Sequence, residues 1–260
     1  MVRRCFAVVC LLGIISVGGL SSASPSWAET LVEQNVETRV ALALRVPQAE
    51  AQKWLPAPWQ VNPFASGPSK AANFLLMFRD RALILDAEGK PVAGGRDRGV
   101  VLLIPAKQAQ TGETALHIVR VFTVNPQFLP GAYKNSALAT VRWEQSLKAS
   151  DLDSGVGVEA WEVRDTAGGM IDFRVQYQRA VPTRSKPEVK AHGGLDPNFF
   201  RIYRIDRGED VVKSIPAGVD RVQSYQLHVT MAELRKLFDG SEQLVSISVL
   251  PWYMRQVSLP

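Results

Sequence analysis

Apolar and polar residues alternate in short segments along most of the chain. Over residues 36–46 the side chains of Val40, Leu42 and Leu44 fall on one face, which is typical of a half-buried strand. Similar runs, separated by turns that contain Gly, Pro, Asn or Asp, predict roughly ten strands in all. The further strands are expected over residues 73–85, 99–104, 116–124, 137–147, 156–163, 170–179, 199–205, 219–229 and 244–250.

Two short helices are expected between these strands. Pro47 suits a first helical turn, where its missing N–H costs nothing, so a helix is predicted over residues 48–55. The run from Thr230 to Glu233 has the spacing of a capping box, in which each side chain bonds the backbone N–H of the other residue. This box predicts a helix that continues through Phe238.

Many strands and few helices favour a barrel or a sandwich. The length of the strands favours a sheet that curves strongly and closes, because an open sheet would leave long unprotected edges. We therefore expect a mainly β (α+β) fold, a closed or strongly curved antiparallel β-barrel of about ten strands with two short helices. No linker rich in Pro, Gly or Ser divides residues 29–260, so one domain is expected there.

The first 28 residues have the pattern of a cleavable export signal. Arg3 and Arg4 precede an apolar run over residues 5–20, which at about fifteen residues is short for a membrane span of roughly twenty. Ser26 and Ala28 place small residues at the positions that a signal peptidase requires, so cleavage is expected after Ala28. An uncleaved anchor is the alternative. The expected location is periplasmic or secreted, with the choice between Sec and twin-arginine export left open.

Composition narrows the chemistry of the remaining chain. Both cysteines, Cys5 and Cys10, lie in the expected signal, so residues 29–260 can form no disulfide and offer no thiolate. The net charge of +5 falls to +3 without Arg3 and Arg4, since 28 basic residues then face 25 acidic ones. These charges are interspersed, and no nucleic-acid-binding signature is present. We expect no nucleic-acid partner, and no membrane span once the signal is removed.

Several catalytic motifs are absent from the sequence. It contains no G-x-S-x-G elbow, no phosphate-binding P-loop and no G-x-G-x-x-G fingerprint. The three histidines, His117, His192 and His228, are isolated from one another in sequence. Because zinc usually requires three or four converging ligands, no metal site and no cofactor are expected.

The segment from Phe128 to Ser136 carries the most informative chemistry. It places a single lysine, Lys134, next to Tyr133 where the chain leaves a loop and re-enters the sheet. A lysine that loses hydration has a lowered pKa, and a neutral amine can attack a carbonyl to form a Schiff base. A loop lysine whose ammonium group stays in water is the alternative reading.

The order of elements resembles the acetoacetate decarboxylase-like superfamily of closed, cone-shaped β-barrels. The matching features are Trp54-Leu55-Pro56 after the first strand, a long hairpin, the Gly131-to-Asn135 loop, and a capped helix before the last strand. The resemblance covers most of residues 36–250.

The resemblance implies a role for Lys134. In the classical decarboxylase this loop reads Gly-Tyr-Pro-Lys-Lys, where the first lysine forms the Schiff base and the second lowers its pKa. Gly131 matches the glycine and Lys134 the Schiff-base lysine, but Asn135 replaces the second lysine. Lys134 would therefore depend on desolvation, or on Arg142 or Arg120 if either points inward.

The resemblance also implies a pocket with further polar groups. Lys134, Glu144 as carboxylate and Arg120 as guanidinium are the candidate catalytic residues. The candidate binding residues are Tyr133, Phe122, Phe74, Leu76 and Arg142.

Three hypotheses on function remain. The first is a Schiff-base lyase that acts on a small keto acid or carbonyl compound through Lys134. The second is a non-catalytic protein that binds a small keto acid or apolar carboxylate on the same barrel. The third is a structural protein whose barrel is filled by side chains. Association into a homo-oligomer is left open.

Overall fold

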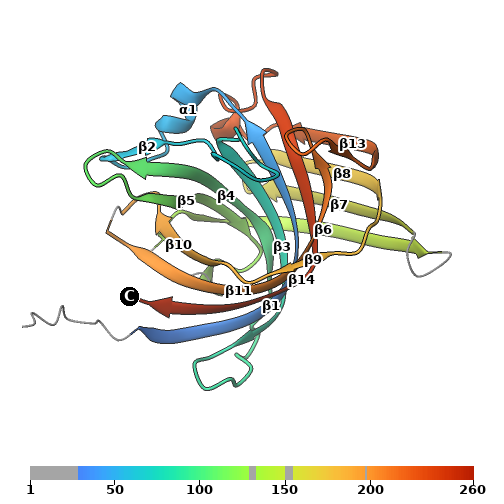
Figure 1. Ribbon diagram of the computed structural model, residues 1–260. Coiled ribbons are helices and arrows are strands. Elements are labelled where there is room, and N and C mark those ends of the chain that lie inside the picture. The colour runs from blue at the N-terminus through green and yellow to red at the C-terminus, as the bar shows by residue number, and fades with distance from the viewer. Residues whose placement is uncertain (1–28, 129–132, 150–154, 197) are drawn as a thin grey trace, which may run out of the picture.

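Seven strands of the described part of the chain close into a ring (Figure 1). The computed structural model describes residues 29–128, 133–149, 155–196 and 198–260. Around the ring the order is β5-β10-β11-β14-β1-β3-β4, and β4 pairs again with β5. The strands are β1 (Thr30–Arg45), β3 (Phe74–Leu85), β4 (Asp97–Gln108), β5 (Thr114–Thr123), β10 (Glu188–Gly193), β11 (Phe200–Ser214) and β14 (Gln243–Leu259).

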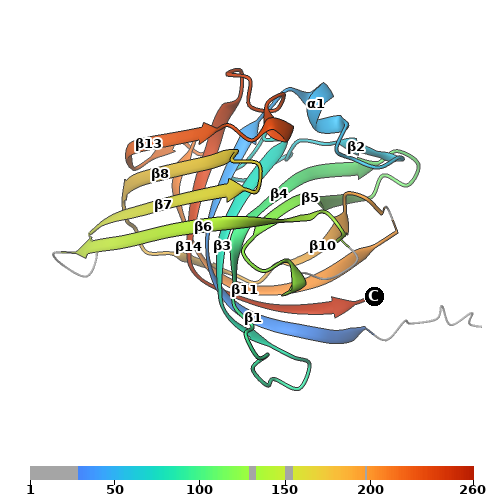
Figure 2. The same cartoon turned by 180° about the vertical axis from the view of Figure 1, so that it is seen from behind.

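A second sheet packs against the outside of this ring (Figure 2). It has the order β13-β8-β7-β6 and joins the ring where the first residues of β6 pair with β5. Its strands are β6 (Ser136–Ala149), β7 (Gly155–Asp165), β8 (Met170–Gln178) and β13 (Val222–Val229). The remaining described elements are β2 (Trp59–Val61), β9 (Thr183–Ser185), β12 (Val219–Asp220), the helix α1 (Gln48–Gln52) and the 3-10 turns η1 (Pro126–Phe128) and η3 (Ala232–Leu234).

The apolar core lies between the ring and the second sheet. Phe78 of β3 packs on Phe173 of β8 and Trp161 of β7, with ring centroids 5.1 and 5.6 Å away. All three side chains are buried. Phe74 and Leu76 point the same way as Phe78 because side chains alternate along a strand.

The opposite face of the same strands points into the ring. On β3 this face carries Leu75, Met77, Arg79 and Arg81. Strands buried on both faces need apolar residues at nearly every position, which explains the continuous apolar run at the start of β3. The interior of the ring also contains several buried charged residues, among them Arg79 and Arg81.

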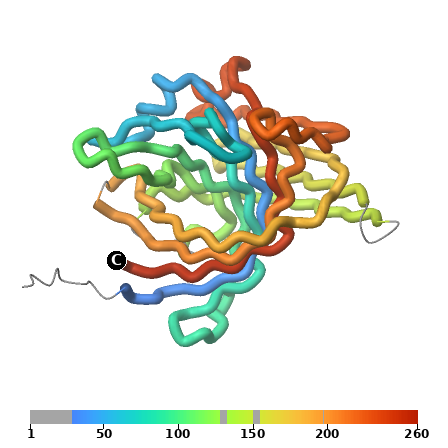
Figure 3. The backbone as a smooth tube through the Cα atoms, in the orientation of Figure 1, coloured from blue at the N-terminus to red at the C-terminus, as the bar shows by residue number. Residues whose placement is uncertain are grey.

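The sequence-based prediction of a mainly β, strongly curved sheet is confirmed. The described residues form more strands than the ten expected, and two pairings, β5–β10 and β5–β6, are parallel. β1 and β14 run side by side along almost their whole length, from Thr30 opposite Leu259 to Arg45 opposite Gln243 (Figure 3).

The two helix predictions need correction. The first helix ends at Gln52 rather than at residue 55. The second expected helix is only the 3-10 turn η3. Thr230 does not cap it, because the Thr230 hydroxyl oxygen instead accepts a hydrogen bond of 3.0 Å from the backbone N–H of Met170. Thr230 thus links the chain just before η3 to Met170, the first residue of β8 after the β7–β8 hairpin.

Two predictions fall partly or wholly outside the described residues. The expected export signal, residues 1–28, lies outside them, and so do Gly131 and Ala132 of the Lys134 loop. In the part of the chain that the structure describes, no helix has the length and apolar character needed to cross a bilayer.

Candidate active site inside the ring

A cavity of about 100 Å³ lies inside the ring. Its volume is small beside the several hundred Å³ of pockets for drug-sized ligands, so a ligand would have only a few heavy atoms. Contiguous strands β4, β5 and β10 supply an apolar wall. Strands β11, β14, β1 and β3 supply the opposite part, which is rich in arginine and tyrosine. The apolar wall includes Val101, Leu103, Leu116, Ile118, Val121 and Val189, and the other part includes Arg39, Arg79, Tyr203, Arg207, Tyr253 and Arg255.

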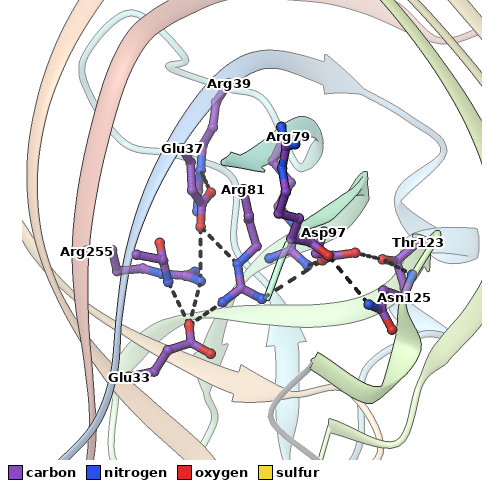
Figure 4. Close-up of polar contacts among 11 residues, drawn as sticks. Glu33, Glu37, Arg39, Arg79, Arg81, Asp97, Thr123, Asn125 and Arg255 are labelled. Carbon is purple, nitrogen blue, oxygen red and sulfur yellow. Dashed lines mark hydrogen bonds and ion pairs between the residues drawn. The ribbon is translucent and has the colours of Figure 1, made fainter. Parts of the chain in front are cut away.

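Three arginines that line this cavity, Arg39, Arg79 and Arg255, belong to a buried ionic network. Figure 4 shows the side chains of this network. Glu37 accepts a hydrogen bond of 2.6 Å from Nε of Arg39, and Nη2 of Arg255 lies 3.2 Å from Glu37 Oε1. Nε of Arg81 is 3.6 Å from the same oxygen. Glu37 therefore holds three arginines together, from strands β1, β3 and β14.

Asp97 of β4 holds the other side of the network. Its Oδ2 accepts a 2.7 Å hydrogen bond from Nη2 of Arg79 and lies 3.9 Å from Nη1 of Arg81. The hydroxyl of Thr123 donates to Asp97, and the backbone N–H of Asn125 donates to Thr123 at 3.2 Å. These bonds link the ionic network to the end of β5, from which the Lys134 loop continues.

The network contains one more positive than negative charge. Arg39, Arg79, Arg81 and Arg255 contribute +4 and Glu33, Glu37 and Asp97 contribute −3, which leaves +1. The four arginines are all buried. A buried charge without a partner is costly, so the network favours an anion in the adjoining cavity.

The arginines also control the charge of Glu37. Burial alone would raise the pKa of the Glu37 carboxyl, but Arg39, Arg255, Arg79 and Arg81 together hold it well below its ordinary value. Burial also opposes the charge on Arg255, yet Glu37 raises the Arg255 pKa above its usual range. Both groups therefore remain charged at neutral pH.

Arg39 offers the best-placed donor for such an anion. Its Nε bonds Glu37, and its guanidinium lies 3.7 Å above the ring centroid of Tyr253. The Nη1 nitrogen donates to the sulfur of Met77, at 2.7 Å, and a thioether is a weak acceptor. Among the described residues no oxygen accepts a hydrogen bond from this end of Arg39, which lines the cavity.

Two tyrosines close part of the cavity wall. The Tyr133 hydroxyl donates to the backbone oxygen of Ala191 at 3.0 Å, and the Tyr203 hydroxyl lies 2.7 Å from that of Tyr133. Tyr203 is therefore the donor in the second bond. Burial and the neighbouring Tyr203 raise the pKa of Tyr133 well above its ordinary value, so its hydroxyl stays protonated.

Lys134 does not share the position of Tyr133. Tyr133 and Asn135 are buried, and Asn135 donates from its side-chain amide to the backbone oxygen of Ile118. Between them, Lys134 has its side chain exposed and a left-handed backbone with φ of 49°. Among the described residues no lysine lines the cavity. Lys134 therefore lacks the desolvated position that the sequence analysis expects.

The other candidate catalytic residues also lie away from the cavity. Arg120 donates to Glu233 at 2.9 Å on the outside of the ring. Glu144 is exposed on the second sheet, where it lies 3.7 Å from Arg174. Arg142, two residues before Glu144 on β6, is also outside the cavity lining. The structure thus does not bring Arg120, Arg142 and Glu144 together with Lys134.

Three of the candidate binding residues belong to the core between the sheets. Phe74, Leu76 and Phe122 are fully buried there, on the strand faces that point away from the ring interior. Of all the residues proposed from the sequence, Tyr133 alone lines the cavity. The catalytic and binding roles of the others stay predictions without geometric support.

Sequence reasoning missed the ionic network. A signal for it exists, because Arg39 interrupts an apolar alternating strand and Arg79-Asp80-Arg81 interrupts a continuous apolar run. Charged residues inside strands buried on both faces require buried partners. That requirement points to an internal polar site, although it does not give the partners.

Comparison with solved structures finds proteins of similar architecture. No family model and no curated protein matches the sequence. An acetoacetate decarboxylase-like enzyme from Sphingomonas wittichii RW1 is similar over 90% of this chain and 94% of its own, with 12% identity and a TM-score of 0.58. The enduracididine biosynthesis enzyme MppR, complexed with pyruvate, is similar over 87% and 88% of the two chains, with 10% identity and a TM-score of 0.56.

A third similarity agrees with the first two. Acetoacetate decarboxylase from Legionella pneumophila is similar over 96% of this chain and 98% of its own, with 12% identity and a TM-score of 0.50. Identities this low establish the fold alone, since one fold hosts many activities. The protein has the acetoacetate decarboxylase-like fold.

Proposed function

We propose that the protein binds a small organic carboxylate, such as a keto acid, in the cavity inside its ring. The observation that carries the proposal is the Nη1 end of Arg39, which has only the weak acceptor sulfur of Met77 as a hydrogen-bond partner among the described residues and lines the cavity beside a buried network with a net charge of +1. A carboxylate there would accept charge-assisted hydrogen bonds and balance that charge. The apolar wall, which includes Leu103 and Val189, would contact the carbon chain.

The size of the cavity supports a ligand of a few heavy atoms. About 100 Å³ corresponds to the volume of roughly three water molecules, which suits a two- to four-carbon acid. A protein of the same fold, MppR, has been solved in complex with pyruvate. Pyruvate and acetoacetate are therefore the first ligands to test.

A Schiff-base lyase acting through Lys134 is the second candidate. The observation in its favour is the left-handed backbone of Lys134, φ 49°, because strained non-glycine residues cluster at functional sites. The amine would attack a ketone carbon, lose water to form an imine, and allow a 3-keto acid to release CO₂ and leave an enamine. This chemistry requires the Lys134 side chain to turn inward.

We further propose that the protein is exported, with residues 1–28 as a cleavable signal. The support is the sequence pattern that ends at Ser26-Trp27-Ala28. The intact mass of the protein recovered from the periplasm or medium tests this. A chain that begins at Glu29 would support it, and one that retains residues 1–28 would contradict it.

Titration calorimetry tests the ligand proposal. Pyruvate and acetoacetate are titrated into the wild-type protein, with acetone as the neutral analogue. We expect the two acids to bind and acetone not to bind. Replacing Arg39 by Met should weaken binding at least about tenfold, because a hydrogen bond to a charged group contributes about 1.5–3 kcal/mol.

Two further variants make that experiment decisive. Arg39→Lys keeps a cation beside Glu37 but loses the planar guanidinium, so it should fold and still bind more weakly than wild type. Arg142→Gln removes an arginine of the second sheet and should bind like wild type. Equal affinity of wild type and Arg39→Lys, or no binding of either acid, would contradict the proposal.

Borohydride reduction separates the two candidates. The protein is incubated with acetoacetate or pyruvate, reduced, and mapped by mass, with Lys134→Ala as the control. A specific adduct on Lys134 would support the lyase. Calorimetric binding without an adduct would favour binding alone.

A further inference from the structure

Two histidines face each other where the ring is closed by its shortest pairing. β5 and β10 pair in parallel through three residue pairs, and the middle pair is His117 opposite His192. The two imidazoles stack with centroids 5.3 Å apart and planes 29° apart. His117 is fully buried and His192 is 5% exposed.

Aromatic side chains cover this pair. Trp59 of β2 lies over both imidazoles, with centroid distances of 4.5 Å to His117 and 4.9 Å to His192. Phe200 of β11 stacks on His192 at 5.0 Å. Trp59 is only 2% exposed, so water is excluded from this side of His117.

Among the described residues no carboxylate acts on His117 to favour its charged form. Burial is the main cause that lowers the pKa of His117 to about 4, the charge of His192 lowers it further, and a hydrogen bond with the backbone of Gly193 opposes this shift only in part. The chargeable side chain nearest in register is Arg201 of β11, opposite Ala191, and it lies over the ring of Phe199. Lys190 and Glu188 of β10 and Lys107 of β4 lie farther along the packed strands. Lys190 lies over Phe200 and Glu188 pairs with Arg204.

The paired segments of β5 and β10 also form the cavity wall. Leu116 and Ile118, on either side of His117, line the cavity, and so does Ala191 beside His192. Just after this pairing the backbones of the two segments remain very close to each other. A Cβ added at Gly194 would lie 2.9 Å from the Cα of Val119. The short pairing therefore holds the apolar wall of the cavity in place.

We propose that the His117–His192 pair is an acid-sensitive latch: protonation of His117 separates β5 from β10 and opens the cavity wall. A protonated His117 would be buried under Trp59 and would lie beside a second imidazole, that of His192. Separation of β5 from β10 would expose the protonated imidazole to water, which stabilises its charge. The proposal concerns the wall itself and holds whichever ligand the cavity accepts.

The size of the effect follows from linkage. The open form has an ordinary histidine, pKa about 6.5, and the closed form has a His117 pKa of about 4. The equilibrium constant for opening, which is small at neutral pH, should then increase about 60-fold when the pH is lowered from 7.0 to 4.5. Opening is favoured by acid because the open form binds the additional proton.

Hydrogen exchange with peptide resolution tests the latch. Wild-type protein is labelled at pH 7.0 and 4.5, with labelling times scaled to the intrinsic exchange rate at each pH. Peptides that contain residues 114–123 and 188–193 should lose protection by up to about 60-fold at pH 4.5. Peptides from β8, residues 170–178, should stay better protected than those of β5 and β10 at both pH values, because the global unfolding that exposes β8 has a higher free energy than separation of β5 from β10.

Matched variants distinguish the latch from general acid unfolding. His117→Phe keeps an aromatic ring under Trp59 but cannot be protonated, so it should abolish the acid response of β5 and β10. His117→Gln provides the same test if the phenylalanine does not fit. His228→Gln removes an exposed histidine of β13 and should respond like wild type.

Three outcomes would overturn the proposal. One is unchanged protection of β5 and β10 in the wild-type protein at pH 4.5. Another is protection of β8 no greater than that of β5 and β10 at pH 4.5, which would indicate global unfolding. The third is a wild-type acid response in both His117 variants.

Discussion

Replacing Glu37 by Gln should destabilise the protein strongly. The carboxylate of Glu37 is fully buried and binds or neighbours three arginines, at 2.6 Å for Arg39, 3.2 Å for Arg255 and 3.6 Å for Arg81. The substitution changes the shape of the side chain little. It raises the net charge of the buried network from +1 to +2.

The expected magnitude follows from the cost of an uncompensated buried charge. Removing one partner of a buried ion pair typically costs about 3–5 kcal/mol. This is a large part of the roughly 5–15 kcal/mol by which a domain is stable. With a urea m-value of about 2 kcal/mol/M, the unfolding midpoint should fall by roughly 1.5–2.5 M.

Urea denaturation monitored by circular dichroism measures this loss. Glu162→Gln is the matched control, because Glu162 also binds an arginine, Arg164, but does so at the surface of the second sheet. The control should unfold at the wild-type midpoint. A loss for Glu37→Gln below about 1 kcal/mol, in the range of a surface ion pair, would refute the account of the ionic network.

Three further predictions concern the core and the response to acid. Gly157→Ala should lower the free energy of unfolding, measured by thermal denaturation, by about 1–3 kcal/mol. The added Cβ would lie 2.5 Å from Cζ of Tyr177 and overpack the core. Wild-type stability of this variant would contradict the packing described. Phe78→Ala should cost about 3–5 kcal/mol, measured by urea denaturation, and a loss below 1 kcal/mol would mean that the core between the sheets is not continuous. Because burial lowers the pKa of His117 to about 4, the unfolded state binds more protons between pH 6.5 and 4. The free energy of unfolding, measured by urea denaturation at each pH, should thus be highest above pH 6.5 and fall by up to about 3 kcal/mol as the pH approaches 4. His117→Phe should remove most of that fall.

The fold could be predicted largely because its strands are long and regular. Alternation along β1 and the hairpin signals between β7 and β8 give the strands directly. What they do not give is which strands pair at a distance, such as β1 with β14 or β5 with β10. Pairings across many residues depend on tertiary packing, which no local pattern records.

The candidate site could be predicted only in part, and the reason is the burial of β3 on both faces. The resemblance implies Phe74 and Leu76 as pocket residues, but the neighbouring face of β3, with Leu75 and Arg79, points into the ring. A shift by one residue changes the face, and the apolar run over residues 74–78 contains no polar residue to fix it. The same shift separates Lys134, which is exposed, from Tyr133, which lines the cavity.

Nitrogen-15 NMR of the arginine side chains would test the central claim, that a carboxylate binds at Arg39 inside the ring, most directly. The Nε–H resonance of Arg39 is assigned with the Arg39→Lys variant, and pyruvate is then titrated into the labelled wild-type protein. We predict a saturable shift of the Arg39 and Arg255 resonances, and none for Arg164 at the surface. Saturable binding of pyruvate that leaves the Arg39 and Arg255 resonances unmoved would contradict the account.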